Sequence, residues 1–129
     1  MTGETDLAVL LRSMQPDLRG KDWGFAVAHA VPEGILPFAT VAEDEGLTLV
    51  APMAALQSAG LAPEGPMARI SLTVHSSLQA VGLTAAFATA LGQAGISANV
   101  IAGFHHDHIF VAAADADRAM TVLRALSNA

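Results

Sequence analysis

The sequence has no cysteine, no tyrosine and a single tryptophan among its 129 residues. Without cysteine there are no disulfides, thiolate nucleophiles or thiolate metal ligands, so thiol chemistry is excluded. Basic residues are also scarce, six against twelve acidic ones, and the formal net charge is −6. A chain of this charge repels phosphate backbones, and it offers few aromatic platforms on which bases stack. We therefore expect no binding to nucleic acid.

Long apolar runs and a basic leader are missing as well. Hydrophobic residues make up 53% of the chain, but no stretch of about 18 apolar residues continues without a polar break. Glu4 and Asp6 stand where a secretory signal carries basic residues, and Arg12 interrupts the first apolar run. We expect a soluble, cytoplasmic protein with no membrane contact. Its length fits one domain, or two small units that share a core.

The first half of the sequence predicts short elements of both kinds. The expected order is a helix over 6–14, strands over 23–29, 38–42 and 47–51, and a short helix from Pro52 that ends at Gly60. The acidic turn EDEG, Glu43 to Gly46, joins two of these strands as a hairpin, and we interpret it as a solvated turn. Two prolines and a glycine within 62–66 indicate a boundary. We divide the chain there into units 1–64 and 65–129.

The second half predicts the order β-α-β-β-α. Ile70, Leu72 and Val74 alternate with polar residues in a strand, and strands over 96–102 and 106–112 lie between two helices. With one more strand this is the ferredoxin-like unit, whose two helices cover one face of an antiparallel sheet. The first half has strands to spare. We therefore predict an α+β fold in which the two halves interlock.

Four quoted stretches, some of them overlapping, carry a family resemblance. The run VGLTAAFATALGQAGISANVI, Val81 to Ile101, resembles the first helix and second strand of an ACT domain. The stretches ISLTVHSSLQAVGLTAAFA and ISANVIAGFHHDHIFV, with FATVAEDEGLTLVAP in the first half, resemble a small stand-alone bacterial family of two ACT-like units. That family is related to the ACT modules of aspartokinase and of the arginine sensors. The resemblance covers nearly the whole chain.

This resemblance implies both an architecture and a role. The architecture is two interlocked ferredoxin-like ACT units of the βαββαβ type, the first of them degenerate, with antiparallel sheets and helices on one face. Because ACT units chiefly sense ligands and oligomerise, the implied protein is an allosteric regulator. It would be a homodimer that binds a small molecule, most plausibly an amino acid, without catalysis, cofactor or metal.

The segment from His75 to Leu83 is the expected ligand site. A polar loop that enters a helix exposes backbone N–H groups at the positive end of the helix dipole, which suits a carboxylate. Gly82 has no Cβ, so it either leaves room for a ligand or permits tight helix packing. In the resembling family this loop is the usual effector site. The strand within ISANVIAG adds a second wall: if Val100 faces the helices, alternation turns Asn99 to the other side, where it can line the same site. The candidate ligand residues are His75, Ser76, Ser77, Gln79, Val81, Gly82, Leu83, Asn99, Val100 and Ile101.

Two features of this loop leave alternatives open. Ser76 and Ser77 are also candidate N-caps for the helix. Many ACT domains that bind amino acids carry Asp-x-Pro-Gly where this chain has QAVG, residues 79–82. The identity of the ligand is therefore open.

The segment GFHHDHIFV, Gly103 to Val111, invites a metal hypothesis. Histidine and carboxylate are ligands of zinc and iron. If Ile109 and Val111 face the core, His106 and His108 share the opposite face with His75, while His105 and Asp107 point away. One alternative is therefore a metal-dependent enzyme built on His75, His106 and His108. We favour a structural role, with hydrogen bonds across the hairpin and Phe110 packed between the units. A ligand-free oligomerisation module is a further alternative.

Overall fold

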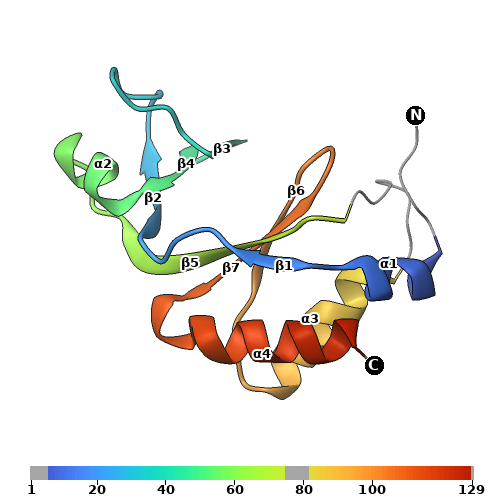
Figure 1. The fold of residues 1–129 in the computed structure, drawn as a ribbon. Coiled ribbons are helices and arrows are strands. Elements are labelled where there is room, and N and C mark those ends of the chain that lie inside the picture. The colour runs from blue at the N-terminus through green and yellow to red at the C-terminus, as the bar shows by residue number, and fades with distance from the viewer. Residues whose placement is uncertain (1–5, 75–81, 129) are drawn as a thin grey trace.

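The computed structural model describes residues 6–74 and 82–128. Seven strands form one sheet, and the helices pack against it (Figure 1). The elements are α1 (Leu7–Ser13), β1 (Pro16–Leu18), β2 (Trp23–Ala28), β3 (Ala39–Glu43), β4 (Gly46–Pro52), α2 (Met53–Ser58), β5 (Glu64–Leu72), α3 (Leu83–Gln93), β6 (Asn99–Ala102), β7 (Asp107–Ala112), the 3₁₀ turn η1 (Ala113–Asp115) and α4 (Ala116–Ser127). None of these helices is long and apolar enough to cross a membrane, as far as the structure describes the chain.

Strand β5 belongs to both halves of the sheet. The strand order is β3-β4-β2-β5-β7-β6, and β1 pairs with β5 on the same side as β2. The first part of β5 pairs with β2, whereas its last residues, Ile70 to Leu72, pair with β1. Thus β3-β4-β2-β5 forms one four-stranded unit and β1-β5-β7-β6 forms the other. The N-terminal segment supplies the fourth strand of the second unit, which confirms that the halves interlock. The proposed boundary after residue 64 falls at the start of β5.

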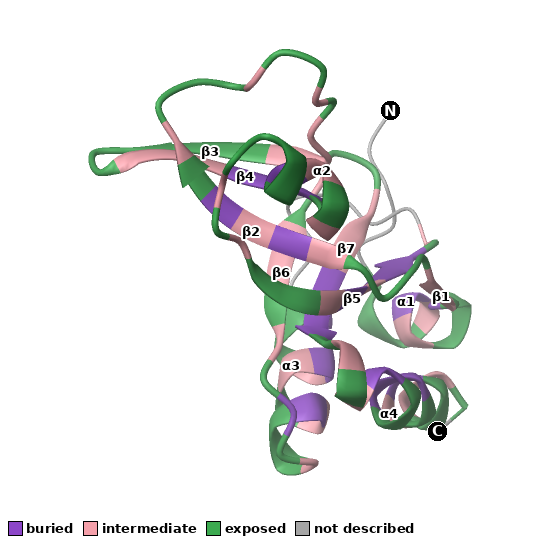
Figure 2. Ribbon diagram, turned by 90° about the vertical axis from the view of Figure 1, so that its left-hand side faces the viewer, coloured by how far each residue is buried: buried purple, intermediate pink, exposed green. Residues whose placement is uncertain are grey.

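The helices lie on one face of the sheet. Ala68, Ile70 and Leu72 of β5 point into the core beneath α3 and α4, and Ala26 of β2 points into the core beneath α2. The opposite face is continuous from β2 to β7, because Trp23 of β2 lies near Phe110 of β7 on that side. Figure 2 shows α2 against β2 and β4, with α1, α3 and α4 gathered at the other end of the sheet. The predicted α+β arrangement is confirmed.

The core of the second unit is large and includes the N-terminal helix. Asp6 caps α1, since its carboxylate accepts hydrogen bonds from the N–H groups of Ala8 and Val9. The capped helix places Leu10 and Met14, both fully buried, in this core. The other buried members come from β5, α3, β7, α4 and the segment before β6: Ala68, Ile70, Leu72, Leu83, Phe87, Leu91, Ile96, Ile109, Val111, Ala116, Ala119, Met120 and Leu123.

The core of the first unit is small. Its buried residues are Ala26, Leu49, Ala51 and Leu56. Residues 29–38, which would hold the first helix of a ferredoxin-like unit, form turns and bends instead. The short helix α2 alone covers β2 and β4. The first unit is thus the reduced member of the pair.

Candidate functional site

The predicted ligand loop enters α3 at Gly82. This glycine occupies the N-cap position with a φ of +98°, and α3 begins at Leu83. Ser76 and Ser77 are therefore not the N-cap, because the helix begins too far along the chain. Both of them, with His75, Gln79 and Val81, lie outside the described residues.

The space beside Gly82 is occupied. A Cβ placed on Gly82 would come within 3.0 Å of Cδ2 of Leu7 in α1. On that side the contact agrees with the tight-packing alternative for this glycine. The side chain of Leu83 is 3% exposed and faces the large core, so this residue can offer a ligand only its backbone.

The predicted second wall divides between the two faces of the sheet. Val100 pairs with Ile109 in β7 and packs against the large core. Asn99 and Ile101, its neighbours on β6, alternate onto the helix-free face. Asn99 is exposed, and its Nδ2 donates to the carbonyl oxygen of Phe110 at 3.4 Å. A ligand on the helix-free face would meet Asn99 and Ile101 but not Val100.

The histidines of the GFHHDHIFV segment make contacts across strands. Nδ1 of His108 lies 2.7 Å from Oγ of Ser71 in β5, and Nδ1 of His106 lies 3.2 Å from the carbonyl oxygen of Val74. These contacts agree with the structural interpretation. Within residues 6–74 and 82–128, no three histidine or carboxylate side chains are placed to hold a metal ion. The three-histidine alternative needs His75, which the structure does not describe.

Aromatic side chains from both units meet on the helix-free face. Phe110 of β7 is fully buried, with its ring centroid 5.3 Å from that of Phe25 and 5.8 Å from that of Phe38. This confirms the prediction that Phe110 packs between the units. We call the group around it the seam cluster; its members are Trp23, Phe25, Phe38, Arg69, Ser71, His108 and Phe110.

Arg69 is the cation of the seam cluster. Its guanidinium carbon lies 4.0 Å from the ring centroid of Phe38 and 5.2 Å from that of Trp23. Its Nε donates to Oγ of Ser71 at 3.2 Å. The same oxygen lies 2.7 Å from Nδ1 of His108; with the proton of neutral His108 assigned to Nε2, Ser71 donates this hydrogen bond.

The seam cluster keeps His108 uncharged at neutral pH. Burial, with smaller contributions from the charges of Arg69, His106 and Arg19, lowers the pKa of His108 to about 4. Burial and the charge of Arg19 likewise lower the pKa of Arg69, while Asp17 acts in the opposite direction. A guanidinium stays protonated even so. The cluster therefore holds one fixed positive charge beside a neutral imidazole.

The sequence alone did not single out Trp23, Phe38 or Arg69. The only available signals were a lone tryptophan at a strand start and an arginine on the polar side of a strand. Neither signal shows that the three side chains meet, since they come from β2, the residue before β3, and β5. The backbone of Phe38 is held beside β4 by a hydrogen bond from its N–H to the carbonyl oxygen of Val50, at 2.7 Å.

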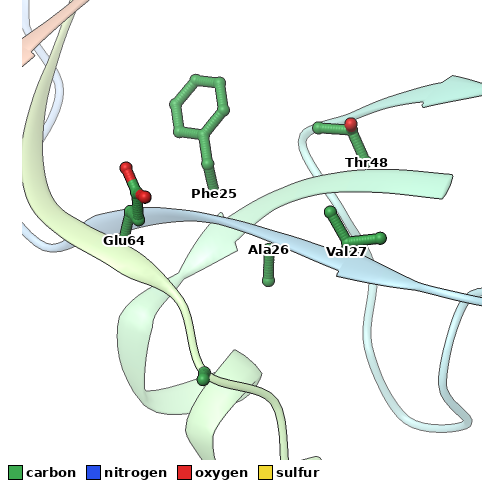
Figure 3. Close-up of a pocket in the computed structure, with 6 residues that line it drawn as sticks. Phe25, Ala26, Val27, Thr48 and Glu64 are labelled. Atoms are coloured by element: carbon green, nitrogen blue, oxygen red, sulfur yellow. The ribbon is translucent and has the colours of Figure 1, made fainter. Parts of the chain in front are cut away.

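A hollow of about 440 Å³ lies along the open edge of β2. Figure 3 shows Phe25, Val27 and Glu64 projecting to one side of the strands, and Ala26 to the other. Thr48 and Ala62 complete its lining. Among the described residues that line it, none is a predicted ligand residue and Glu64 alone is charged. It lacks the converging polar groups that fix a ligand's orientation.

Comparisons with known proteins decide the family. Two family profiles, both described as ACT domain, match residues 2–68 and 68–125. The chain belongs to the ACT domain family. The two matches meet at residue 68, inside β5, which is the strand that the two ACT units share. No curated protein sequence matches the chain.

Solved structures resemble the whole ACT pair. A Vibrio cholerae protein of unknown function, described as a possible transport protein, is 48% identical; the match covers 94% of this chain and 95% of that one, with a TM-score of 0.83. An Agrobacterium tumefaciens protein is 16% identical over 88% of this chain and 89% of its own, at a TM-score of 0.74. The regulatory subunit of aspartate kinase from Thermus thermophilus is 11% identical over 88% and 98%, at a TM-score of 0.66. The last two likenesses concern the fold.

Proposed function

We propose that this tandem ACT protein is a cytoplasmic regulator that binds a small-molecule effector, an amino acid, and has no catalytic activity. The observation that carries the proposal is that ACT units account for residues 2–125, and ACT units are typically regulatory ligand-binding modules. The structural likeness to the aspartate kinase regulatory subunit supports the same role. The protein would act as a homodimer, and effector binding would change the contacts between its subunits.

The effector would bind between the loop from His75 to Leu83 and the strand from Asn99 to Ile101. Helix α3 presents its N-terminal N–H groups at the end of this loop, where a carboxylate is favoured. Gly82 also touches Leu7 of α1, whose next turn is buried in the large core. A ligand that moves the start of α3 would therefore shift α1 and β1. This would favour one packing of the units over another.

A screen of amino acids and related metabolites by thermal unfolding tests this function. A true effector at a hundred times its dissociation constant should stabilise the protein by about 2.7 kcal/mol. Asn99→Ala should weaken the response, whereas Thr40→Ala, on the exposed edge strand β3, should leave it unchanged. Sedimentation with and without the effector would show whether the subunit contacts respond.

Other results would favour the alternatives. Zinc or iron at about one ion per chain in protein purified without a tag, lost in His106→Ala, would support a metal-dependent enzyme. A stable dimer that no metabolite stabilises would support a ligand-free oligomerisation module. Either result would contradict the proposed effector binding.

A further inference from the structure

Arg69 is a half-buried cation that forms no ion pair with an acidic residue of the described part of the chain. The ion pairs among the described residues join Arg19 to Asp17, Lys21 to Asp117, and Arg118 to Asp115. Arg69 takes part in none of them, and in this part of the chain the only hydrogen bond of its side chain runs from Nε to Ser71. Charges removed from water are usually paired, because an unpaired one loses hydration without compensation. The structure thus leaves a place for an anion.

The side chain of Arg69 is already held in position. The rings of Phe38 and Trp23 contact the guanidinium, and Ser71, itself bonded to His108, fixes Nε. Such contacts orient a guanidinium without neutralising it. The two Nη groups keep their donors, arranged as the end-on fork that matches both oxygens of one carboxylate.

The charges around Arg69 also favour an anion. His108 is neutral, and Arg19 is near enough to lower the pKa values of both Arg69 and His108. Asp17 is the nearby carboxylate with the opposite effect, but it is bonded to Arg19 at 2.9 Å. In a chain of net charge −6, this is a localised positive region, and a bound carboxylate would supply the missing counter-charge.

We propose that Arg69 binds the carboxylate of a small organic acid on the helix-free face, flanked by Trp23 and Phe38. The carboxylate accepts hydrogen bonds from both Nη groups, while Ser71 and His108 hold Nε in place. The site uses side chains of both ACT units, so its occupancy depends on how the units are packed. It does not use the loop from His75 to Leu83 and stands independently of the proposed effector site.

The single tryptophan provides a direct measurement. The chain has no tyrosine, and Trp23 contacts the guanidinium, so its fluorescence reports on this place. Acetate titrated at constant ionic strength, with chloride as the replaced ion, should change the fluorescence in a saturable manner. Arg69→Met keeps the apolar stem but removes the charge and should weaken binding by about tenfold or more. Arg69→Lys keeps the charge but loses the forked pair of donors. Its affinity for acetate should lie between those of the native chain and Arg69→Met.

A matched control separates this site from general electrostatics. Arg124→Met removes an exposed arginine from α4, outside the seam cluster, and should leave the acetate response as in the native chain. Asn99→Ala, which tests the proposed effector site, should also leave it unchanged. The experiments can therefore contradict acetate binding at Arg69 without contradicting the proposed amino-acid site, and the reverse.

Three results would overturn the proposal. The first is an acetate response in Arg69→Met or Arg69→Lys as strong as in the native chain. The second is a fluorescence change that chloride reproduces at equal ionic strength. The third is a loss of self-association in Arg69→Met with no saturable acetate response in the native chain, because Arg69 would then serve a contact between copies. Thermal unfolding of each variant establishes that it is folded at the titration temperature.

Discussion

The two ACT units share β5 but differ greatly in what packs against it. Among the described residues, the second unit buries fifteen in its core, drawn mainly from three helices and the strands beneath them. The first unit buries four under the six-residue helix α2. The N-terminal helix α1 precedes the first unit in sequence, yet it packs on the second. The second unit therefore has the means to fold around its own core, whereas the first depends on β5 and the seam cluster.

Matched leucine truncations should show this asymmetry as the largest effect. Leu123 in α4 and Leu56 in α2 are both fully buried. Leu123→Ala should lower the free energy of unfolding by about 4 kcal/mol and Leu56→Ala by about 2, near the two ends of the range for buried leucines. The short α2 can move inward and partly fill the space that the truncation leaves. Urea unfolding measures both values, and equal losses would contradict a difference between the cores.

The alternation of apolar and polar residues along the strands predicted which side chains of the second unit face its core. Ile70 and Leu72 face the core and Ser71 faces away, as their order implied, and the same reasoning placed His108 and Phe110 on the helix-free face. Local pattern sufficed here because one face of each strand is apolar.

Local pattern could not reveal features that depend on distant contacts. Strand β1 is three residues long and begins with Pro16; it is a strand because β5 offers it an edge. The positive φ of Gly82 likewise belongs to the way the chain enters α3 beside Leu7. The seam cluster combines side chains far apart in sequence, so Arg69 resembled an ordinary polar residue of a strand until the fold placed it beside Phe38.

Lowering the pH should reduce the stability of the protein by an intermediate amount, through protonation of His108 in the seam cluster. The pKa of His108 is lowered from 6.5 to about 4 by burial and by nearby cations. The unfolded chain therefore takes up this proton at a higher pH than the folded chain does. The contribution of His108 to stability is constant above about pH 6.5 and is lost as the pH falls toward 4.

His108→Asn isolates this contribution. Asparagine keeps an acceptor near the place of Nδ1 for Ser71 but does not titrate in this range. Between pH 6.5 and 4, the free energy of unfolding should fall less for the variant than for the native chain. The difference should grow as the pH falls. Burial raises the pKa of Asp107, although His106 opposes this shift; because both proteins keep Asp107, its effect cancels in the comparison. Parallel stability curves would contradict a lowered pKa of His108 in the folded state.

The smallest effects should come from two glycines of the second unit that differ in backbone conformation and in surroundings. Gly82 has a φ of +98° and touches Leu7 of α1, whereas Gly92 lies within α3 with open space beside it. Gly82→Ala should destabilise by about 1 to 2 kcal/mol through backbone strain. Gly92→Ala should stabilise by about 0.5 to 1 kcal/mol, because alanine is the better helix residue.

Leu7→Ala then separates strain from packing at the junction of α1 and α3. If α1 packs on the second unit as described, the crowding between Leu7 and a Cβ at residue 82 contributes to the cost of Gly82→Ala. That cost should therefore be smaller in a Leu7→Ala background, with a coupling of about 0.5 kcal/mol or more. Gly92→Ala should show no coupling to Leu7→Ala, because nothing lies near its Cβ. Additive effects at Gly82 would mean that α1 leaves this contact in solution, and the second unit would then hold its large core without help from the start of that helix.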